Sequence, residues 1–202
     1  MMVWVKVCGI SKRTDLDAAA EAGADAVGLV LAAGTPRCIT VDQATRLAGQ
    51  SPVPGILVTV DESPEDLMEL VERTGARGVQ PHGEHQADAA KEAARNGLMV
   101  LRPVRVGKDR FSLDHVPGSQ IPILDTADTR RHGGTGRTFD HDALPPIHRR
   151  WVLAGGMGPH NVAEAIQKLQ PWGVDASSHL ESELGVKDPA RIHAFVREAK
   201  GQ

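Results

Sequence analysis

A cysteine near the N-terminus ends an apolar stretch, where a strand would present it as a reacting group. The β-branched run Val5-Lys6-Val7 leads into Cys8 and Gly9, and a stretch typical of a helix start follows. Free cysteine is most often a small buried hydrophobe, so spacing alone favours a packed core residue. The rest of the chain reverses that preference. Cys8 is therefore a candidate base, a role that requires the thiolate and a lowered pKa.

An aspartate, Asp125, ends a second apolar run, Ile121–Leu124. A carboxylate in that place can form a turn or cap a helix. Partly desolvated, it would instead hold a proton near neutral pH and act as a general acid. Lys6 lies two residues before Cys8 on the same face of the strand, so it is either a positive charge beside the thiol or a salt-bridge partner of Asp175.

Two segments near the C-terminus are typical of a phosphate site. Gly155 and Gly156 precede a helix predicted to open at Pro159, and backbone N–H groups there would approach an anion at the positive helix end. The pair Ser177-Ser178 follows the next predicted strand and adds hydroxyl groups. An isolated Gly-Gly is usually only a tight turn, but its place after the seventh of eight predicted strands favours phosphate binding.

Arg37 follows Pro36 in a predicted loop. Most loop arginines are solvated, whereas the functional alternative is a planar fork that binds a carboxylate. His82, in Gln80-Pro81-His82-Gly83, follows another predicted strand. Polar or titratable residues thus follow nearly every strand, at the end where barrel enzymes place their sites.

Short β-branched runs alternate with helical patterns almost throughout the chain, which predicts a parallel sheet covered by helices. Eight such repeats favour an α/β fold closed into a (β/α)8 TIM barrel. An open doubly wound sheet is the main alternative, but the residues after Cys8 supply no Gly-rich dinucleotide turn. The predicted strands are Val3–Cys8, Ala26–Leu31, Gly55–Val60, Gly78–Gln80, Leu98–Val106, Ile121–Thr126, Trp151–Ala154 and Gly173–Ser177.

Helix signals fill most gaps between these strands. The helices after strands five and six are expected to be weak or irregular, and the second is interrupted by prolines. The glycine-rich loop Ala127–Thr138 is long enough to act as a lid. Helix starts are predicted at Thr40 with Gln43, at Ser63-Pro64, at Pro159 and at Asp188-Pro189. The two weak helices are predicted near Lys108–Asp114 and Asp142–His148.

Composition excludes several classes of protein. A chain of 202 residues with 41% hydrophobic residues suits one domain, residues 1–202. A net charge of -3 and 3% aromatic residues argue against nucleic-acid binding. The sequence shows neither a membrane span nor a signal peptide, so we expect a cytoplasmic protein. Cys8 and Cys38 form no disulfide framework and lack histidines at metal-ligand spacing, so we expect no metal.

Together these stretches resemble phosphoribosylanthranilate isomerase, a barrel enzyme of tryptophan biosynthesis. Each fragment is weak alone, but their order and spacing are specific and span nearly the whole chain. The fragments are Lys6–Ile10, Gly23–Gly28, Pro36-Arg37, Val79-Gln80 with His82-Gly83, Leu124–Thr126, Gly133–Asp140, Leu153–Gly156 with Pro159 and Asn161-Val162, Val174-Asp175 with Ser177-Ser178, and Gly185 with Lys187-Asp188.

The resemblance implies an Amadori rearrangement of N-(5'-phosphoribosyl)anthranilate to 1-(2-carboxyphenylamino)-1-deoxyribulose 5-phosphate, an aldose–ketose isomerisation that needs no cofactor. The family's general base falls on Cys8 and its general acid on Asp125. Arg37 falls on its contact with the anthranilate carboxylate. Its phosphate grip falls on the loops that hold Gly155, Gly156, Ser178 and His179. His82, Gly134 and Gly136 complete our set of substrate-binding candidates.

The chain departs from the family pattern at four positions. His179 stands where a glycine is usual, and its side chain would crowd the phosphate or, when protonated, donate to it. Leu184 replaces a proline, Cys38 replaces an aromatic residue, and Pro81 removes an N–H donor from strand four. None of these positions is the predicted acid or base.

Three functions remain open on the sequence. The first is the isomerase, with a phosphoribosyl small molecule as its substrate and a monomer or homodimer as its assembly. A related phosphoribosyl-sugar isomerase is the second, although such relatives carry aspartate where Cys8 stands. The third is a non-catalytic or altered-specificity barrel that binds a phosphorylated metabolite, which the changes at Pro81 and His179 suggest and which the retention of Cys8 and Asp125 opposes.

Overall fold

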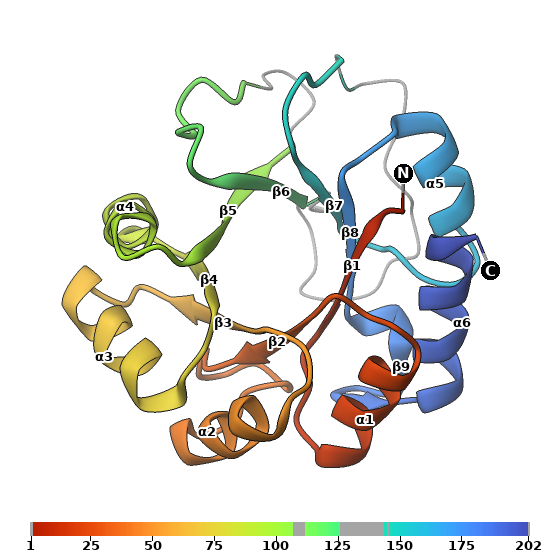
Figure 1. The fold of residues 1–202 in the computed structure, drawn as a ribbon, viewed down its shortest axis with the longest axis horizontal. Helices are drawn as coiled ribbons and strands as arrows, with labels where there is room; N and C mark the ends of the chain where they lie inside the picture. Colours follow the sequence, from red (N-terminus) through yellow and green to blue (C-terminus); the bar gives the residue numbers. More distant parts are fainter. Residues whose placement is uncertain (1, 107–111, 126–143, 145, 202) are drawn as a thin grey trace.

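The chain folds as a closed barrel of eight parallel strands that follow one another in sequence order (Figure 1). This computed structural model describes residues 2–106, 112–125, 144 and 146–201. The closed ring confirms the predicted single-domain TIM barrel and excludes the open sheet. The strands are β1 (Trp4–Cys8), β2 (Ala26–Val30), β3 (Gly55–Val60), β4 (Gly78–His82), β5 (Met99–Arg105), β6 (Ile121–Asp125), β7 (Val152–Ala154) and β8 (Gly173–Ala176).

Strand β4 is longer than predicted, because it continues through Pro81 to His82. The predicted end of this strand at Gln80 is therefore wrong. Pro81 pairs in register with Thr59 of β3, whereas β4 meets β5 only at Gly78 and Val79. The proline lies beyond the part of β4 that is paired on both sides, so its missing N–H costs no hydrogen bond to β5. The extension carries His82 to the rim of the barrel.

Six α-helices lie among the described residues, and they cover the outside of the ring (Figure 1). The predicted caps are confirmed: Thr40 and Gln43 form a capping box, the Ser63 hydroxyl accepts from the N–H of Asp66, and the Asp188 carboxylate accepts from two N–H groups. The helices are α1 (Arg13–Glu21), α2 (Val41–Gln50), α3 (Pro64–Thr74), α4 (Gln86–Arg95), α5 (Val162–Leu169) and α6 (Pro189–Lys200).

Three predicted helices need correction. The helix expected to open at Pro159 begins only at Val162, because residues 159–161 form a turn. No helix occurs at residues 112–114, or at residues 144 and 146–148. In the first of these segments the Ser112 hydroxyl donates to the Asp114 carboxylate, a local bond that favours a turn. The remaining parts of these two predicted helices lie outside the described residues.

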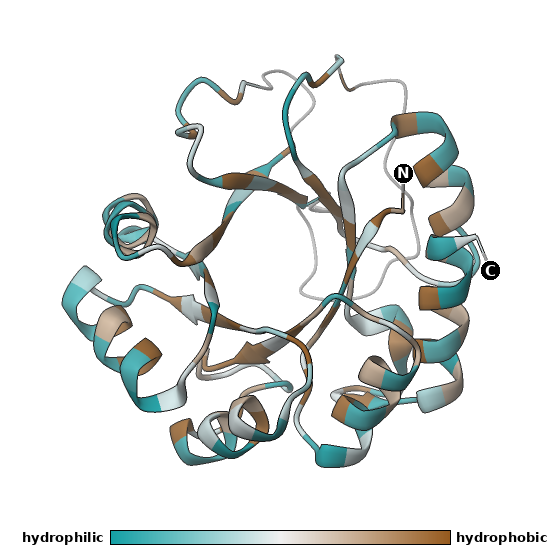
Figure 2. Ribbon diagram, viewed as in Figure 1, coloured by the Kyte–Doolittle hydropathy of each residue, from teal (hydrophilic) through white to brown (hydrophobic). Residues whose placement is uncertain are grey.

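The apolar side chains form two layers, separated by the strands. Colouring by hydropathy shows largely hydrophobic strands and helices that mix hydrophilic and hydrophobic residues (Figure 2). The larger cluster fills the space between the strands and the helices. A smaller one, which includes Ile56, Leu101 and Ile123, fills the barrel interior. Cys8 packs with Val30 and Val58 in a third cluster.

A short hairpin after β8 was not predicted. A 3-10 turn at Ser178–Leu180 leads into β9 (Glu181–Glu183), which pairs antiparallel with β10 (Val186–Lys187). The hairpin is too short to give a period-two hydrophobic signal. It brings the side chains of Glu181 and Lys187 into buried positions beside the barrel. None of the helices that the structure describes has the length and apolarity to cross a bilayer.

Candidate active site

The predicted acid, base and binding residues gather at one rim of the barrel. Cys8, His82 and Asp125 are the last residues of β1, β4 and β6. Arg37 lies between β2 and α2, and Ser178 follows β8. Parallel strands in a closed barrel end at the same face, so these residues share the face where barrel enzymes place their chemistry. The candidates Gly134 and Gly136 and the predicted lid, residues 127–138, fall outside the described residues.

Cys8 is a buried thiol, with 8% of its surface exposed. Burial raises its pKa, and the nearby Lys6 ammonium opposes that rise. The lowered pKa that the role of base requires is therefore opposed by burial, because desolvation of the thiolate outweighs the positive charge. Lys6 nonetheless lies where it stabilises the thiolate once that forms.

A buried ion pair crosses the barrel interior beside the thiol. The fully buried Lys6 Nζ donates to Asp175 Oδ1 and to Gln80 Oε1, at 3.0 Å each. Burial alone would lower the pKa of Lys6, but the charges of Asp175 and then Cys8 raise it. The predicted Lys6–Asp175 salt bridge is confirmed, and the same ammonium also acts on Cys8. Both interpretations of Lys6 from the sequence therefore hold.

Gln80 connects Lys6 to His82 through hydrogen bonds of its side-chain amide. An ammonium only donates, so the Gln80 atom facing Lys6 is the oxygen, and its amide nitrogen faces His82 Nε2 at 3.2 Å. Burial, with the charges of Lys6 and Arg105, lowers the pKa of His82 to about 4. The ring is therefore neutral, accepts at Nε2 and carries its proton on Nδ1. The network leaves His82 as a neutral Nδ1–H donor at the rim.

Asp125 retains a proton to higher pH than an ordinary aspartate. Burial raises its pKa, and Arg105 on the neighbouring strand opposes the rise. The side chain reaches solvent at the rim, but the surrounding protein removes enough water to disfavour its charge. The negative charge of Asp125 in turn raises the pKa of Asp175 further, after burial. Asp175 therefore couples electrostatically to both Asp125 and Cys8.

Arg37 is held by a carboxylate of the chain itself. Its Nε and Nη2 donate to the two oxygens of Glu181, at 2.6 and 2.8 Å. Lys187 Nζ and the N–H of Gly185 also donate to Glu181, at 2.8 and 3.1 Å. Burial raises the pKa of Glu181, but the hydrogen bonds from Arg37 and Lys187 outweigh it and hold that pKa below its ordinary value. This side-on grip leaves the Nη1/Nη2 edge of Arg37 to face a second carboxylate.

Hydrogen bonds connect the cluster of Arg37, Glu181 and Lys187 to the end of β1. Lys187 Nζ donates to the Ser177 carbonyl at 3.0 Å, and the Ser177 hydroxyl donates to the carbonyl of Cys8 at 3.0 Å. Gly9 follows with φ +80°, and a Cβ there would lie 2.8 Å from Arg37 Cδ. A glycine is required at this point on both counts. The sequence indicated neither Glu181 nor the part of Lys187, because their contacts depend on the unpredicted hairpin.

The predicted phosphate loop is a turn closed by side chains. His179 Nδ1 lies 2.8 Å from the Gly156 carbonyl, which only accepts, so Nδ1 carries a proton. The Asn161 amide donates to the same carbonyl, at 3.0 Å, and its oxygen accepts from the N–H of Gly158, at 2.9 Å. Helix α5 begins only after this turn, so backbone N–H groups that would face an anion here belong to the loop. The structure thus brings Gly156 and His179 together, as predicted for a shared site.

The residues that the structure describes include no group of three or more His, Cys, Asp or Glu side chains placed to hold a metal ion. The polar groups at the rim are instead proton donors, acceptors and charges. Such a set can protonate one atom of a substrate and deprotonate another, which is the chemistry of an isomerase.

Residues 5–198 match the model of the family described as N-(5'phosphoribosyl)anthranilate (PRA) isomerase. The chain belongs to this family. It is 40% identical over 209 residues to the N-(5'-phosphoribosyl)anthranilate isomerase of Natronomonas pharaonis, with 99% of each chain covered. It is 35% identical to that of Thermotoga maritima, covering 99% of this chain and 100% of the relative.

Solved PRA isomerases share the whole fold. The crystal structure of the Thermotoga maritima enzyme superposes with a TM-score of 0.91 at 35% identity, covering 100% of both chains. A second structure, described as a complex with reduced 1-(o-carboxyphenylamino)-1-deoxyribulose 5-phosphate, gives a TM-score of 0.83 at 32% identity, with both chains fully covered. The fold of this chain thus matches these two solved PRA isomerases over their whole length.

Cys8 depends on a glycine in the neighbouring strand. A Cβ at Gly28 would lie 2.6 Å from Cys8 Sγ, whereas one at Gly49 of α2 meets nothing within 4 Å. We expect Gly28→Ala to displace the thiol and to lower kcat roughly 10–100-fold. Gly49→Ala should leave kcat unchanged and add up to about 1 kcal/mol of stability. Steady-state kinetics and urea unfolding of both variants test this, and equal kcat values for the two would contradict it.

Glu181 is the carboxylate on which Arg37 and Lys187 converge, whereas Glu183 on the same strand is exposed. We expect Glu181→Gln to cost roughly 2–5 kcal/mol of unfolding free energy, because it leaves the buried Lys187 and the partly buried Arg37 without their counter-charge. Glu183→Gln should be nearly neutral. Urea unfolding measures the stability of both variants. A loss of unfolding free energy in Glu181→Gln no greater than that in Glu183→Gln would contradict a stabilising role of Glu181.

Proposed function

We propose that the chain catalyses the isomerisation of N-(5'-phosphoribosyl)anthranilate, with Asp125 as general acid and Cys8 as general base. Membership of the PRA isomerase family supports the reaction. The observation that supports these two residues is their position at the same rim, with a carboxyl of raised pKa on β6 and a thiol beside an ammonium on β1.

Asp125 acts first in this proposal. Its proton passes to the ribose ring oxygen as the bond between that oxygen and C1' breaks. The lone pair of the anthranilate nitrogen then forms the C1'=N bond of an iminium ion. A raised pKa suits this step, because the carboxyl must be protonated before it acts.

Cys8 acts second. The iminium ion draws electrons from the neighbouring carbon and makes the C2' hydrogen acidic, so the thiolate removes it and leaves an enolamine. A proton added at C1' and loss of the 2'-hydroxyl proton convert this enolamine to the ketone. The first balances the proton removed at C2', and the second balances the proton that Asp125 gave to the ring oxygen. The Lys6 ammonium lies beside the sulfur and stabilises its negative charge before the transfer. No step of this scheme uses a cofactor.

The two pKa directions set which protonation state reacts. Both groups have raised pKa values, and that of the thiol starts from a much higher ordinary value. The reactive form needs Cys8 as thiolate while Asp125 is still protonated, so it is a minor form of the singly protonated pair. The rate should therefore rise with pH through the lower apparent pKa and fall through the higher one.

The remaining rim residues bind the substrate in this proposal. The Nη1/Nη2 edge of Arg37 binds the anthranilate carboxylate, and the Nδ1–H of His82 donates to the sugar. The phosphate lies against the loops of Gly155, Gly156, Ser178 and His179, where a second proton on the His179 ring would add a donor. Gly134 and Gly136 complete the set from a segment outside the described residues.

The assembly and the location of the enzyme are also proposals. A solved relative is described as monomers made from a dimeric phosphoribosylanthranilate isomerase. A monomer or a homodimer suits this chain equally well, because the described contacts of Cys8 and Asp125 come from one chain. We propose a cytoplasmic enzyme of tryptophan biosynthesis, without a nucleic-acid or membrane partner.

Replacing either reacting group should abolish most turnover without abolishing binding. We expect Cys8→Ser and Asp125→Asn each to lower kcat roughly 100- to 10,000-fold, because each removes one proton transfer. The exposed Cys38→Ser is the matched control and should keep full activity. Loss of anthranilate-type fluorescence from freshly made substrate measures turnover, and titration with a product analogue measures binding.

Full activity in Cys8→Ser or Asp125→Asn would contradict the role given to that residue. A wild-type protein that binds the product analogue but does not turn over substrate would instead support the non-catalytic barrel.

A further inference from the structure

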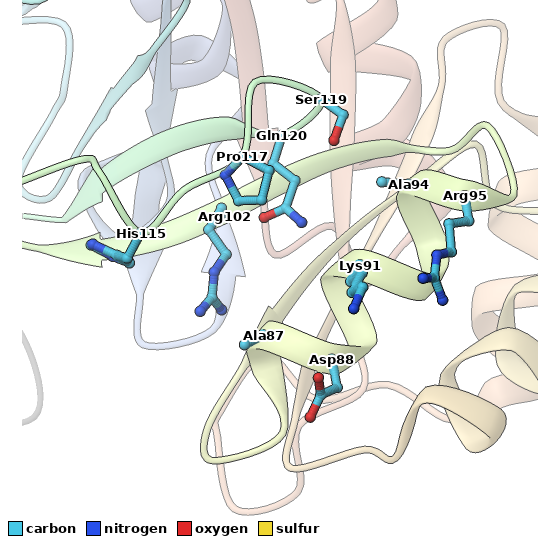
Figure 3. Close-up of a pocket in the computed structure, with 10 residues that line it drawn as sticks. All are labelled: Ala87, Asp88, Lys91, Ala94, Arg95, Arg102, His115, Pro117, Ser119 and Gln120. Atoms are coloured by element: carbon cyan, nitrogen blue, oxygen red, sulfur yellow. The ribbon is translucent and has the colours of Figure 1, made fainter.

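A cavity with several charged residues in its lining lies on the outer flank of the barrel, where α4 faces the segment that leads into β6. Its volume is about 510 Å³, and it is lined by Lys91 and Arg95 of α4, by Arg102 of β5 and by His115 and Gln120 of the following segment (Figure 3). Arg102 lies next to Leu101, which packs inside the barrel, so its own side chain points outward. The cavity is therefore separated from the rim site by the barrel wall.

Arg102 is a buried cation that forms no ion pair with the residues that the structure describes. Its exposed fraction is 7%, and its Nη1 makes no hydrogen bond with any part of the chain that the structure describes. Its side chain lies between the Pro117–Gln120 segment and the turn of α4 that carries Ala87 (Figure 3). Burial lowers its pKa. An unpaired buried guanidinium is costly, whereas an oxyanion bound in the cavity would remove that cost.

The walls around Arg102 favour an anion. Lys91 adds a second positive charge, Arg95 adds a third that is 3.5 Å from Glu92, and His115 can add another when protonated. Asp88 is the one acidic residue among the lining residues. Gln120 Oε1 is also buried without a hydrogen bond among the described residues, so it is ready to accept from a hydroxyl or ammonium group next to the anion.

The far wall of the cavity is built rather than loose. Arg149 donates to three backbone carbonyls of that wall, those of Val116 at 2.7 Å, Pro117 at 2.8 Å and Gln120 at 2.6 Å. The N–H of Gln120 closes a turn onto Pro117, at 3.0 Å. These bonds hold Gln120 next to Arg102, although residues 112–120 form no helix. Because this wall is ordered before a ligand binds, binding there costs little conformational entropy.

We propose that this flank cavity is a binding site for a small oxyanion, a phosphate or carboxylate group, with Arg102 as its main donor. The Gln120 oxygen favours a ligand with a hydroxyl or ammonium group beside the anion. The site is independent of the proposed active site, so a ligand there would bind together with the substrate.

Histidine NMR separates the two sites in one experiment. His115 reports on the flank cavity, whereas His160 and His179, which lie with ring centroids 5.2 Å apart, report on the rim loop. Inorganic phosphate, and separately acetate, is titrated into the full-length chain. We expect at least one anion to shift the His115 imidazole signal saturably, with an affinity at least tenfold weaker in Arg102→Met.

The matched control is Arg46→Met, which removes the same charge from an exposed position of α2. It should titrate like the wild type, and Arg102→Met should keep its isomerase activity and its rim signals. If Arg102→Met does not fold, Lys91→Gln should weaken the His115 response at least twofold. A His115 signal that neither anion moves, or that moves equally in the wild type and Arg102→Met, would overturn the proposal without affecting the proposed isomerase.

Discussion

The buried ion pair between Lys6 and Asp175 is the constraint on which the rim depends. A charge in the interior of a barrel is tolerated only when it is paired and hydrogen-bonded, and Lys6 meets both conditions through Asp175 and Gln80. The pair fixes a positive charge beside Cys8 and orients Gln80, which in turn fixes the tautomer of His82. One interaction thus sets the protonation state of several rim groups, and it does so without contacting the substrate itself in our proposal.

The cost of this arrangement appears in the pKa values. The same burial that isolates the pair from water also raises the pKa of Cys8 and of Asp125. For the acid, burial helps, because a protonated carboxyl is what the ring-opening step needs. For the base it hinders, and Lys6 compensates in part. The environment therefore moves both groups in the same direction, and the reactive form, with Asp125 protonated and Cys8 as thiolate, stays the minor one because the thiol has the higher ordinary pKa.

Most of the fold and the central site follow from local sequence patterns. β-Branched runs, caps at Thr40, Ser63 and Asp188, and the Lys6–Asp175 register gave the barrel and its ion pair correctly. The errors arose where tertiary contacts override local signals. Pro81 continues a strand because β5 does not pair there, and Pro159 lies in a turn that Asn161 closes.

Other features had no local signal at all. Glu181 acquires its part only because a three-residue strand folds back beside the barrel, which no periodicity indicates. Arg37 was expected to hold a substrate carboxylate with its fork, and the structure shows that Glu181 already binds the Nε/Nη2 side. The direction of the Cys8 pKa is also a tertiary property, since it is the balance of burial against a charge placed by the whole barrel. The sequence shows which charges are present, but only packing determines how strongly each is desolvated.

The most direct test of this account is the pH dependence of Cys8 alkylation by iodoacetamide. In a Cys38→Ser background Cys8 is the only cysteine, and the alkylation rate follows the thiolate fraction. We predict an apparent pKa above that of an ordinary thiol, raised further by Lys6→Gln and lowered by Asp175→Asn, with circular dichroism confirming that both variants are folded. An apparent pKa at or below the ordinary value, or one that neither substitution moves, would contradict the central role of the buried pair.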